Sequence, residues 1–239
     1  MTYNQQEFDI RLEWGIPGVH ELAPVSEVLI IVDILSFSTS VDIATGKGAF
    51  IYPYAWKDES AFEFARSVQA ELADRQRGTK GYSLSPTSLL NIPAHTKLVL
   101  PSPNGAALSL ASPDVTTLCG CLRNALAVAR YARLVGSKIA VIPAGEQWED
   151  GKLRPSFEDL VGAGAIISYL SGSLSPESKS ALAAFHHVAG DLTSEIRKCS
   201  SGKELIERGF EKDIRLACSV NCSDNVPQLV GNMYSSVSC

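Results

Sequence analysis

The chain has 239 residues, of which 45% are hydrophobic and 20% are charged, and its formal net charge is −5 at pH 7. This composition is typical of a folded globular protein, and the length suits a single α/β domain over residues 1–239. The negative charge argues against a broad footprint for nucleic acid. The N-terminus has no basic, apolar leader, and no apolar run approaches the roughly 18 residues of a membrane span. We therefore expect a cytoplasmic protein without nucleic-acid or membrane partners.

Strands and helices are expected to alternate along the first half of the chain. In order, the patterns predict strands at 8–14 and 28–34, a helix at 40–49, a strand at 49–54 and a helix at 58–77. The last of these is amphipathic, because Phe62, Ala65, Val68 and Leu72 would share one face. Residues 78–93 read as a loop, since Gly, Pro and Ser punctuate them.

The same alternation continues in the second half. The patterns predict strands at 97–105, 115–120 and 138–145 and helices at 122–136, 155–172, 175–190 and 193–209. A last strand is expected within 213–229, followed by an exposed tail. Such alternation favours a layered α/β/α fold with a largely parallel or mixed sheet. The stretches 30–49 and 139–165 share one design, a strand, a small-residue loop and a helix rich in Ala and Gly. That likeness leaves open an internal duplication into two similar halves.

Polar residues and glycines follow the ends of the predicted strands, which is where ligands bind in open α/β sheets. These residues are Asp33, Asn104, Gly105, Gly145, Glu146, Glu158, Asp159 and Asp224. A carboxylate at a strand end, such as Asp33, suits a hard cation like Mg²⁺ or a nucleophile. The hydroxyls that follow it at a helix start suit phosphate, because backbone N–H groups are free there; they are Ser36, Ser38, Thr39 and Ser40.

Together, an acid, a cation and a phosphate cradle predict phosphoryl transfer. Each feature also has a structural interpretation. Ser and Thr at helix starts commonly serve as N-caps, and acids in a first helical turn suit the helix dipole without any metal. Fingerprints of other chemistries are missing: the sequence has no G-x-S-x-G elbow, no G-x-G-x-x-G and no P-loop. A nucleotide-binding module is therefore disfavoured.

Five ordered stretches together resemble the 2-phosphosulfolactate phosphatase family. They are IIVDILSFSTSVDIATGKGA, LPSPNGAAL, CGCLRNALAVARYA, IAVIPAGEQWEDGKLRPSFEDLVGAGAIISYL and DIRLACSVNCSDNVPQL, and they are spread in the family's order nearly from end to end of the chain. The resemblance implies an α/β fold and a Mg²⁺-dependent phosphatase of coenzyme M biosynthesis. It favours Asp33, Asn104 and Asn124 as catalytic residues and Asp33, Glu158, Asp159 and Asp224 as metal ligands. Phosphate would meet Ser36, Ser38, Thr39, Ser40 and Gly105.

The chain departs from that family's pattern at three places. Ser36 stands where the family has an arginine, Pro103 replaces a threonine, and a Gly-Phe-Asp loop is reduced to GYSLSP at 81–86. An arginine beside a strand-end acid would clamp phosphate or sulfonate. Its loss leaves Lys47, Lys80, Arg123 and Arg154 as candidate cations. We therefore expect low activity on phosphosulfolactate and a gain in the Ser36→Arg variant.

Two functions remain open on the sequence. The retained acids favour a Mg²⁺-dependent phosphatase that hydrolyses a small phosphate monoester. The missing arginine and the shortened loop favour a weakly active or non-catalytic relative that binds a small anion or a protein partner. A homodimer is left open as the assembly.

Overall fold

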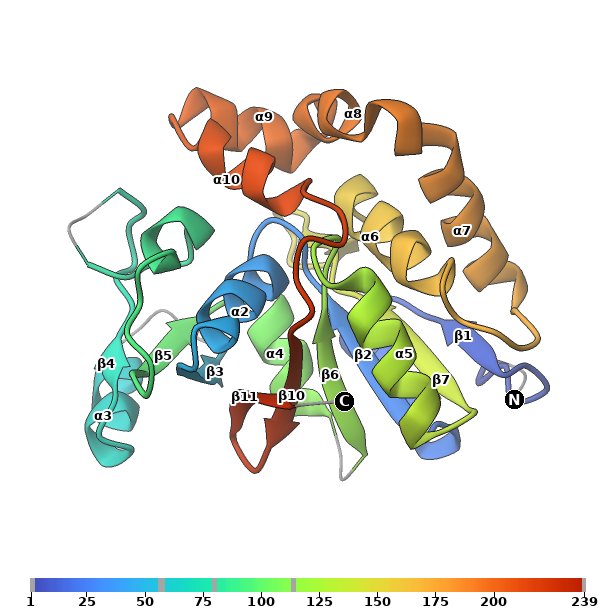
Figure 1. Cartoon of the computed structure of the whole chain (residues 1–239), viewed down its shortest axis with the longest axis horizontal. Helices are drawn as coiled ribbons and strands as arrows, with labels where there is room; N and C mark the ends of the chain where they lie inside the picture. The colour runs from blue at the N-terminus through green and yellow to red at the C-terminus, as the bar shows by residue number, and fades with distance from the viewer. Residues whose placement is uncertain (1–2, 56–58, 79–80, 113–114, 238–239) are drawn as a thin grey trace.

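A mixed β-sheet runs through the molecule, which a computed structural model describes over residues 3–55, 59–78, 81–112 and 115–237 (Figure 1). Within these residues the strand order is β1-β7-β2-β6-β10-β11-β3-β5-β4. The bounds are β1 Ile10–Leu12, β2 Val28–Val32, β3 Phe50–Tyr54, β4 Glu71–Leu72, β5 Lys97–Pro101, β6 Thr116–Gly120, β7 Ile139–Pro143, β10 Val226–Val230 and β11 Met233–Val237. A separate two-stranded ribbon pairs β8 (Glu146–Gln147) with β9 (Leu153–Arg154).

The sheet contains two parallel groups of strands. One is β1, β7, β2 and β6, and the other is β3, β5 and β4. The antiparallel hairpin β10–β11 lies between them and pairs with β6 on one side and β3 on the other. The exposed tail expected after residue 229 is wrong, because Met233–Val237 form β11 in the middle of the sheet and the side chain of Tyr234 is fully buried.

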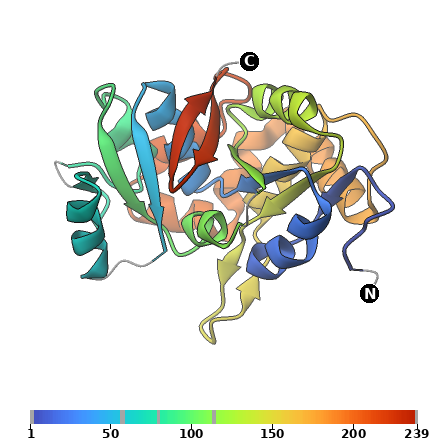
Figure 2. The same cartoon turned by 90° about the horizontal axis from the view of Figure 1, so that it is seen from below.

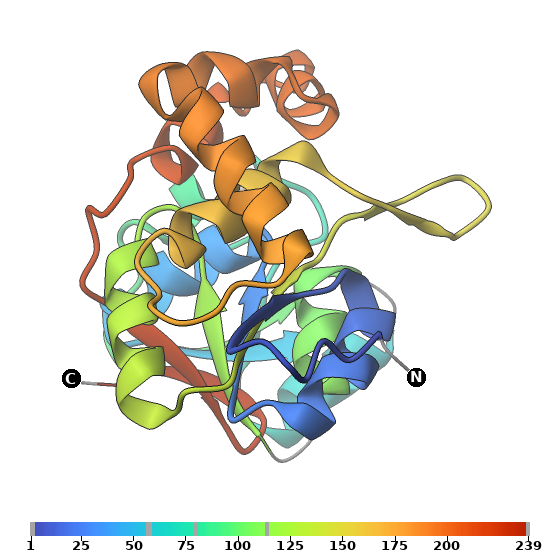
Figure 3. The ribbon, with the colours of Figure 1, turned by 90° about the vertical axis from the view of Figure 1, so that its right-hand side faces the viewer.

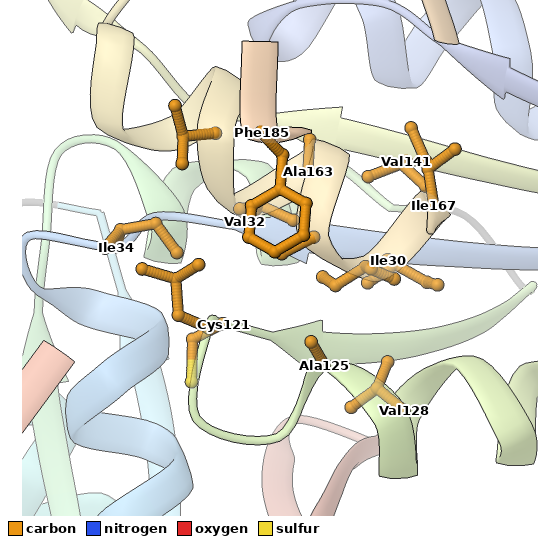
Figure 4. Packing of buried hydrophobic residues seen from close by; sticks show 14 of the residues in the cluster. Ile30, Val32, Ile34, Cys121, Ala125, Val128, Val141, Ala163, Ile167 and Phe185 are labelled. Carbon is orange, nitrogen blue, oxygen red and sulfur yellow. The ribbon is translucent and has the colours of Figure 1, made fainter. Parts of the chain in front are cut away.

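Helices cover both faces of the sheet, which confirms the predicted α/β/α layering. Their bounds are α1 Gly15–Leu22, α2 Phe37–Gly46, α3 Ser60–Ser67, α4 Gly105–Ala111, α5 Ala125–Val135, α6 Phe157–Ile167, α7 Pro176–Val188, α8 Leu192–Lys198, α9 Ser200–Glu207 and α10 Glu211–Ala217. Along β2, Ile30 and Val32 face α5, α6 and α7 (Figure 4), whereas Leu29 and Ile31 face α1 and α4. This alternation is the period of two expected of a strand buried on both faces.

The second parallel group is covered in the same way. Ile51 of β3 packs on the α2 side, and its neighbour Tyr52 packs on the α3 side. The Ala- and Gly-rich α6 lies against α7 at close range, since a Cβ on Gly164 would fall 2.0 Å from the carbonyl oxygen of Ala181. Helices α8, α9 and α10 form a further layer beyond α2 and α6, along the top of Figure 1.

Several predicted boundaries are wrong. The helix expected at 58–77 ends at Ser67, because Gln69 takes a left-handed φ of 53° and residues 71–72 join the sheet edge as β4; position 58 lies outside the described residues. The helix expected at 193–209 breaks at Cys199, whose ψ is 165°. The stretch 213–229, expected to carry the last strand, holds most of α10 and then the start of β10, so the strand itself is confirmed. The two stretches of shared design contain β2 and β7, which are neighbours in one parallel group.

Candidate active site

The carboxyl ends of β2 and β5 meet at Asp33, although four strands separate them in the sheet. The N–H of Gly105, which opens α4, donates to Asp33 Oδ2 at 2.9 Å. The N–H of Phe37, which opens α2, donates to Oδ1 at 3.3 Å, and the Ser102 hydroxyl lies 3.5 Å from Oδ2. The N-terminal ends of two helices therefore fix one carboxylate, where free backbone N–H groups favour negative charge.

Gly105 is needed at this junction for its size. A Cβ there would lie 2.5 Å from a ring carbon of Phe37 and 2.8 Å from Asp33 Oδ2. The sequence predicted that Gly105 contacts phosphate. Its N–H is instead donated to Asp33, so its observed role is to position the acid.

Asp33 lines a cavity of about 190 Å³. The other lining residues are Leu35, Ser36, Arg75, Arg77, Leu84, Ser102, Pro103, Asn104, Glu146, Ser201, Glu204, Leu205 and Arg208. Of the predicted site residues, the structure therefore brings Asp33, Ser36 and Asn104 together. Arginines and carboxylates share the walls, a mixture that suits an anionic ligand held beside an acid.

Glu146 is the second acid of this cavity beside Asp33. It follows the end of β7 and begins the β8–β9 ribbon, which projects from the body of the molecule (Figures 2 and 3). The Asn104 side-chain amide donates to Glu146 Oε2 at 3.0 Å. Burial, and then the negative charge of Asp33, raises the pKa of Glu146 to about 7, against the opposing hydrogen bond from Asn104.

The pKa of Asp33 is also raised, chiefly by burial, and the N–H groups of Gly105 and Phe37 oppose that rise. Two acids of elevated pKa in one cleft are a common mark of a functional site. The sequence predicted Glu146 at a strand end but assigned it no role. Its position after the strand next to β2 was the feature from which a role in the site could have been predicted.

Sequence reasoning missed Arg77. Its Nη1 pairs with Asp213 Oδ2 at 2.9 Å, and its Nη2 donates to Ser36 Oγ at 3.1 Å. The described cations that were expected from the sequence do not line this cavity. Arg123 pairs with the buried Asp42, Arg154 bonds Ser200 and stacks on Trp148, Lys47 is exposed, and Lys80 lies outside the described residues.

The hydroxyls of the first turn of α2 do not reach the cavity. Ser38 Oγ accepts from the Asp33 N–H at 2.9 Å and donates to the Ile31 carbonyl at 3.3 Å. Thr39 donates to the carbonyl of Ile34, and Ser40 donates to that of Leu84. All three side chains are fully buried. The expectation that they contact phosphate is corrected: these hydroxyls tie the turn to its surroundings, which is the structural interpretation noted above.

The remaining predicted residues also lie outside the cavity. Asp159 accepts from the N–H groups of Ile34 and Gly145 and from the Ser156 hydroxyl, so it joins the ends of β2 and β7. Burial, followed by the charges of Asp33 and Glu158, raises its pKa well above the usual range.

Asn124 is saturated by backbone groups of Cys119, Cys121 and Asn225. Asp224 lines a separate cavity beside α5. Glu158 is buried in the first turn of α6 but does not line the cleft. In the described parts of the chain, no cluster of three or more His, Cys, Asp or Glu residues could hold a metal ion. The predicted four-carboxylate metal set is therefore not assembled.

The protein is thus a layered α/β protein with a cleft lined by carboxylates and arginines at its strand ends. The chain belongs to the 2-phosphosulfolactate phosphatase family, whose model matches residues 16–232. A probable 2-phosphosulfolactate phosphatase of Carboxydothermus hydrogenoformans is 30% identical over 211 residues, covering 84% of this chain and 86% of that protein. The 2-phosphosulfolactate phosphatase of Methanothermobacter thermautotrophicus is 30% identical over 208 residues, with the same coverage.

These matches confirm the family inferred from the sequence. A more distant relative, from Caldanaerobacter subterraneus, is 26% identical over 214 residues. None of the helices in the described ranges has the length and apolar character needed to cross a bilayer.

Proposed function

We propose that this protein is a phosphatase that hydrolyses a small phosphate monoester in the cleft at Asp33. The observation that carries the proposal is the convergence of Asp33, Glu146 and Arg77 on one cavity, in a chain whose relatives are named for phosphatase activity. The substrate named for those relatives, 2-phosphosulfolactate, is the first to test. The cleft offers the arginines that such an anion requires.

The residues of the cleft have two roles, which are to position the acids and to supply positive charge to the phosphate. The N–H groups of Gly105 and Phe37 hold Asp33 in one orientation, and the Asn104 amide holds Glu146. Arg77 and Arg75 supply positive charge to the phosphate from the cavity wall. Because each Asp33 oxygen accepts a backbone N–H, the carboxylate is suited to act as a fixed charge, and we assign the attack on phosphorus to water.

Mg²⁺ dependence belongs to this proposal. Magnesium sites commonly use one or two carboxylates and complete their shell with water and substrate phosphate oxygens. Asp33 and Glu146 fit that requirement, because both line the cleft and both have raised pKa values that a nearby positive charge would relieve. When bound, the ion would neutralise charge on the phosphoryl group. Asp159 does not fit, since it does not line the cleft.

Release of inorganic phosphate from 2-phosphosulfolactate and from a simple aryl phosphate tests the proposal, each measured with Mg²⁺ and with EDTA. Asp33→Asn should lose activity by about 100-fold or more, as expected for a charge in contact with the reacting group. Asp224→Asn is the matched control, because it removes a carboxylate in another cavity, and it should keep its activity. Equal losses in both variants, or no turnover of either ester by the wild-type protein, would reject the phosphatase in favour of a non-catalytic anion-binding relative.

A further inference from the structure

We infer that Arg77 is the specificity-determining residue of the cleft, and that its guanidinium reaches the ligand because residue 36 is small. The space beside Asp33 can hold one cationic side chain, which comes either from position 36 or from position 77. The inference rests on the proposed function in taking the ligand to be a phosphate ester. Nothing in the family comparison assigns a role to Arg77, which comes from the segment after β4 and not from α2.

The ion pair with Asp213 fixes the position of the Arg77 guanidinium. Its side chain is only 10% exposed, and its Nη1 pairs with Asp213 of α10, which is 1% exposed. Asp213 Oδ1 also accepts from the Ser85 hydroxyl at 2.8 Å and from both the N–H and the hydroxyl of Thr87. A carboxylate with this many donors keeps the guanidinium in one position, so the arginine is preorganised for a ligand.

Arg77 still has donors to offer. A guanidinium carries five N–H groups, and the contacts to Asp213 and Ser36 use two of them. Arg77 lines the cavity together with Asp33, and its positive charge opposes the burial that raises the pKa of Asp33. Arg75 lines the same wall, and no ion pair joins it to another residue of the described chain. Two arginines therefore face the space beside the acid.

The small side chain of Ser36 makes this placement available. Ser36 is 1% exposed and its Oγ is in contact with Arg77 Nη2. A longer side chain at position 36 would need the volume that Arg77 occupies, and an arginine there would set two like charges in contact. The gain expected for Ser36→Arg from the sequence alone is therefore reversed: in the wild-type background this substitution should weaken anion binding.

Calorimetry with inorganic phosphate and with sulfate tests the inference without requiring turnover. The four proteins are the wild type, Arg77→Ser, Ser36→Arg and the double variant. Arg77→Ser should weaken phosphate binding by about 10- to 150-fold, the range for a charge-assisted hydrogen bond. Ser36→Arg should also bind more weakly than the wild type. The double variant should bind at least about 10-fold more tightly than Arg77→Ser, because the cation then returns from position 36.

Loss of a buried ion pair could weaken binding through misfolding, so a matched control is needed. Arg123→Ser breaks a pair of the same kind, Arg123 with Asp42, at 2.8 Å and with 14% and 0% exposure, but outside the cleft. It should lose stability in urea and keep its phosphate affinity. Adding Asp213→Asn to Arg77→Ser removes the unpaired carboxylate and should restore stability without restoring affinity.

The outcomes separate this inference from the proposed function. Unchanged phosphate affinity in Arg77→Ser, or a double variant no tighter than Arg77→Ser, overturns the inference even if the enzyme hydrolyses its ester. Equal losses of affinity in Arg123→Ser and Arg77→Ser overturn it as well. Tight phosphate binding that depends on Arg77, without turnover of any ester, supports the inference and rejects the phosphatase.

Discussion

Glu146→Gln should stabilise the metal-free protein at alkaline pH and have little effect at acid pH. Burial and the charge of Asp33 raise the pKa of Glu146 from 4.5 to about 7 in the folded state. A raised carboxyl pKa means that the neutral form is favoured by folding. Ionisation of Glu146 therefore costs no stability below about pH 4.5. The cost in unfolding free energy grows between about pH 4.5 and about pH 7 and levels off above that. At 1.36 kcal/mol per pKa unit, its ceiling is about 3 kcal/mol.

Urea denaturation in EDTA at intervals between pH 5 and pH 8.5 measures this effect. Glutamine keeps the oxygen that accepts from Asn104 but cannot ionise, so the difference in free energy of unfolding should widen with pH and level off above about 8. Glu204→Gln is the control, because Glu204 lines the same cavity but is more exposed and pairs with Arg208. Its effect should stay within about 0.5 kcal/mol. A Glu146→Gln effect that is the same at pH 5 and pH 8.5 would refute the electrostatic account.

Three further substitutions test the site. Asp33→Asn should move the Glu146 pKa down from about 7, because a negative charge is removed; carboxyl carbon NMR titration measures it, and an unchanged midpoint would remove Asp33 as a cause. Gly105→Ala should cost about 1–3 kcal/mol of unfolding free energy, since its Cβ would fall 2.5 Å from Phe37, whereas Gly81→Ala meets nothing within 4 Å; equal urea midpoints would contradict this. Ser38→Ala should lower stability by about 1–2 kcal/mol and leave phosphate affinity unchanged, and weakened binding at full stability would show that its hydroxyl faces the ligand.

The part of the site that could be predicted from the sequence depends on local pattern. Asp33 stands after five apolar residues, Val28–Val32, that form a strand buried on both faces, and Asn104 and Gly105 follow a strand in the same way. Ligand sites in α/β sheets gather at such ends. Local pattern could not tell whether Ser38, Thr39 and Ser40 cap a turn or bind an anion, because both uses need the same residue types at the same position.

The rest of the site depends on contacts between distant segments. Arg77 meets Ser36 across 41 residues and Asp213 across 136. The segment around Arg77 was predicted to be helical, and a left-handed Gln69 ends the helix instead. Asp159 fits the pattern of a metal ligand, but it accepts backbone N–H groups of the β2 and β7 loops and does not line the cleft. Such competition between a ligand and the chain's own donors is decided only by tertiary packing.

The cleft is built from two kinds of wall. Asp33 and Gly105 belong to strand and helix ends, where a Cβ on residue 105 has no room, so this centre tolerates little change. The opposite wall combines Arg75 and Arg77 with Glu204 and Arg208 at the end of α9. Arg75, Glu204 and Arg208 are exposed and can be exchanged with less effect on stability, whereas Arg77 is held in a buried ion pair. On the proposed function, a relative that keeps the first wall and alters the second would keep its chemistry and change its substrate, and the Ser36–Arg77 contact is where we expect such a change to act.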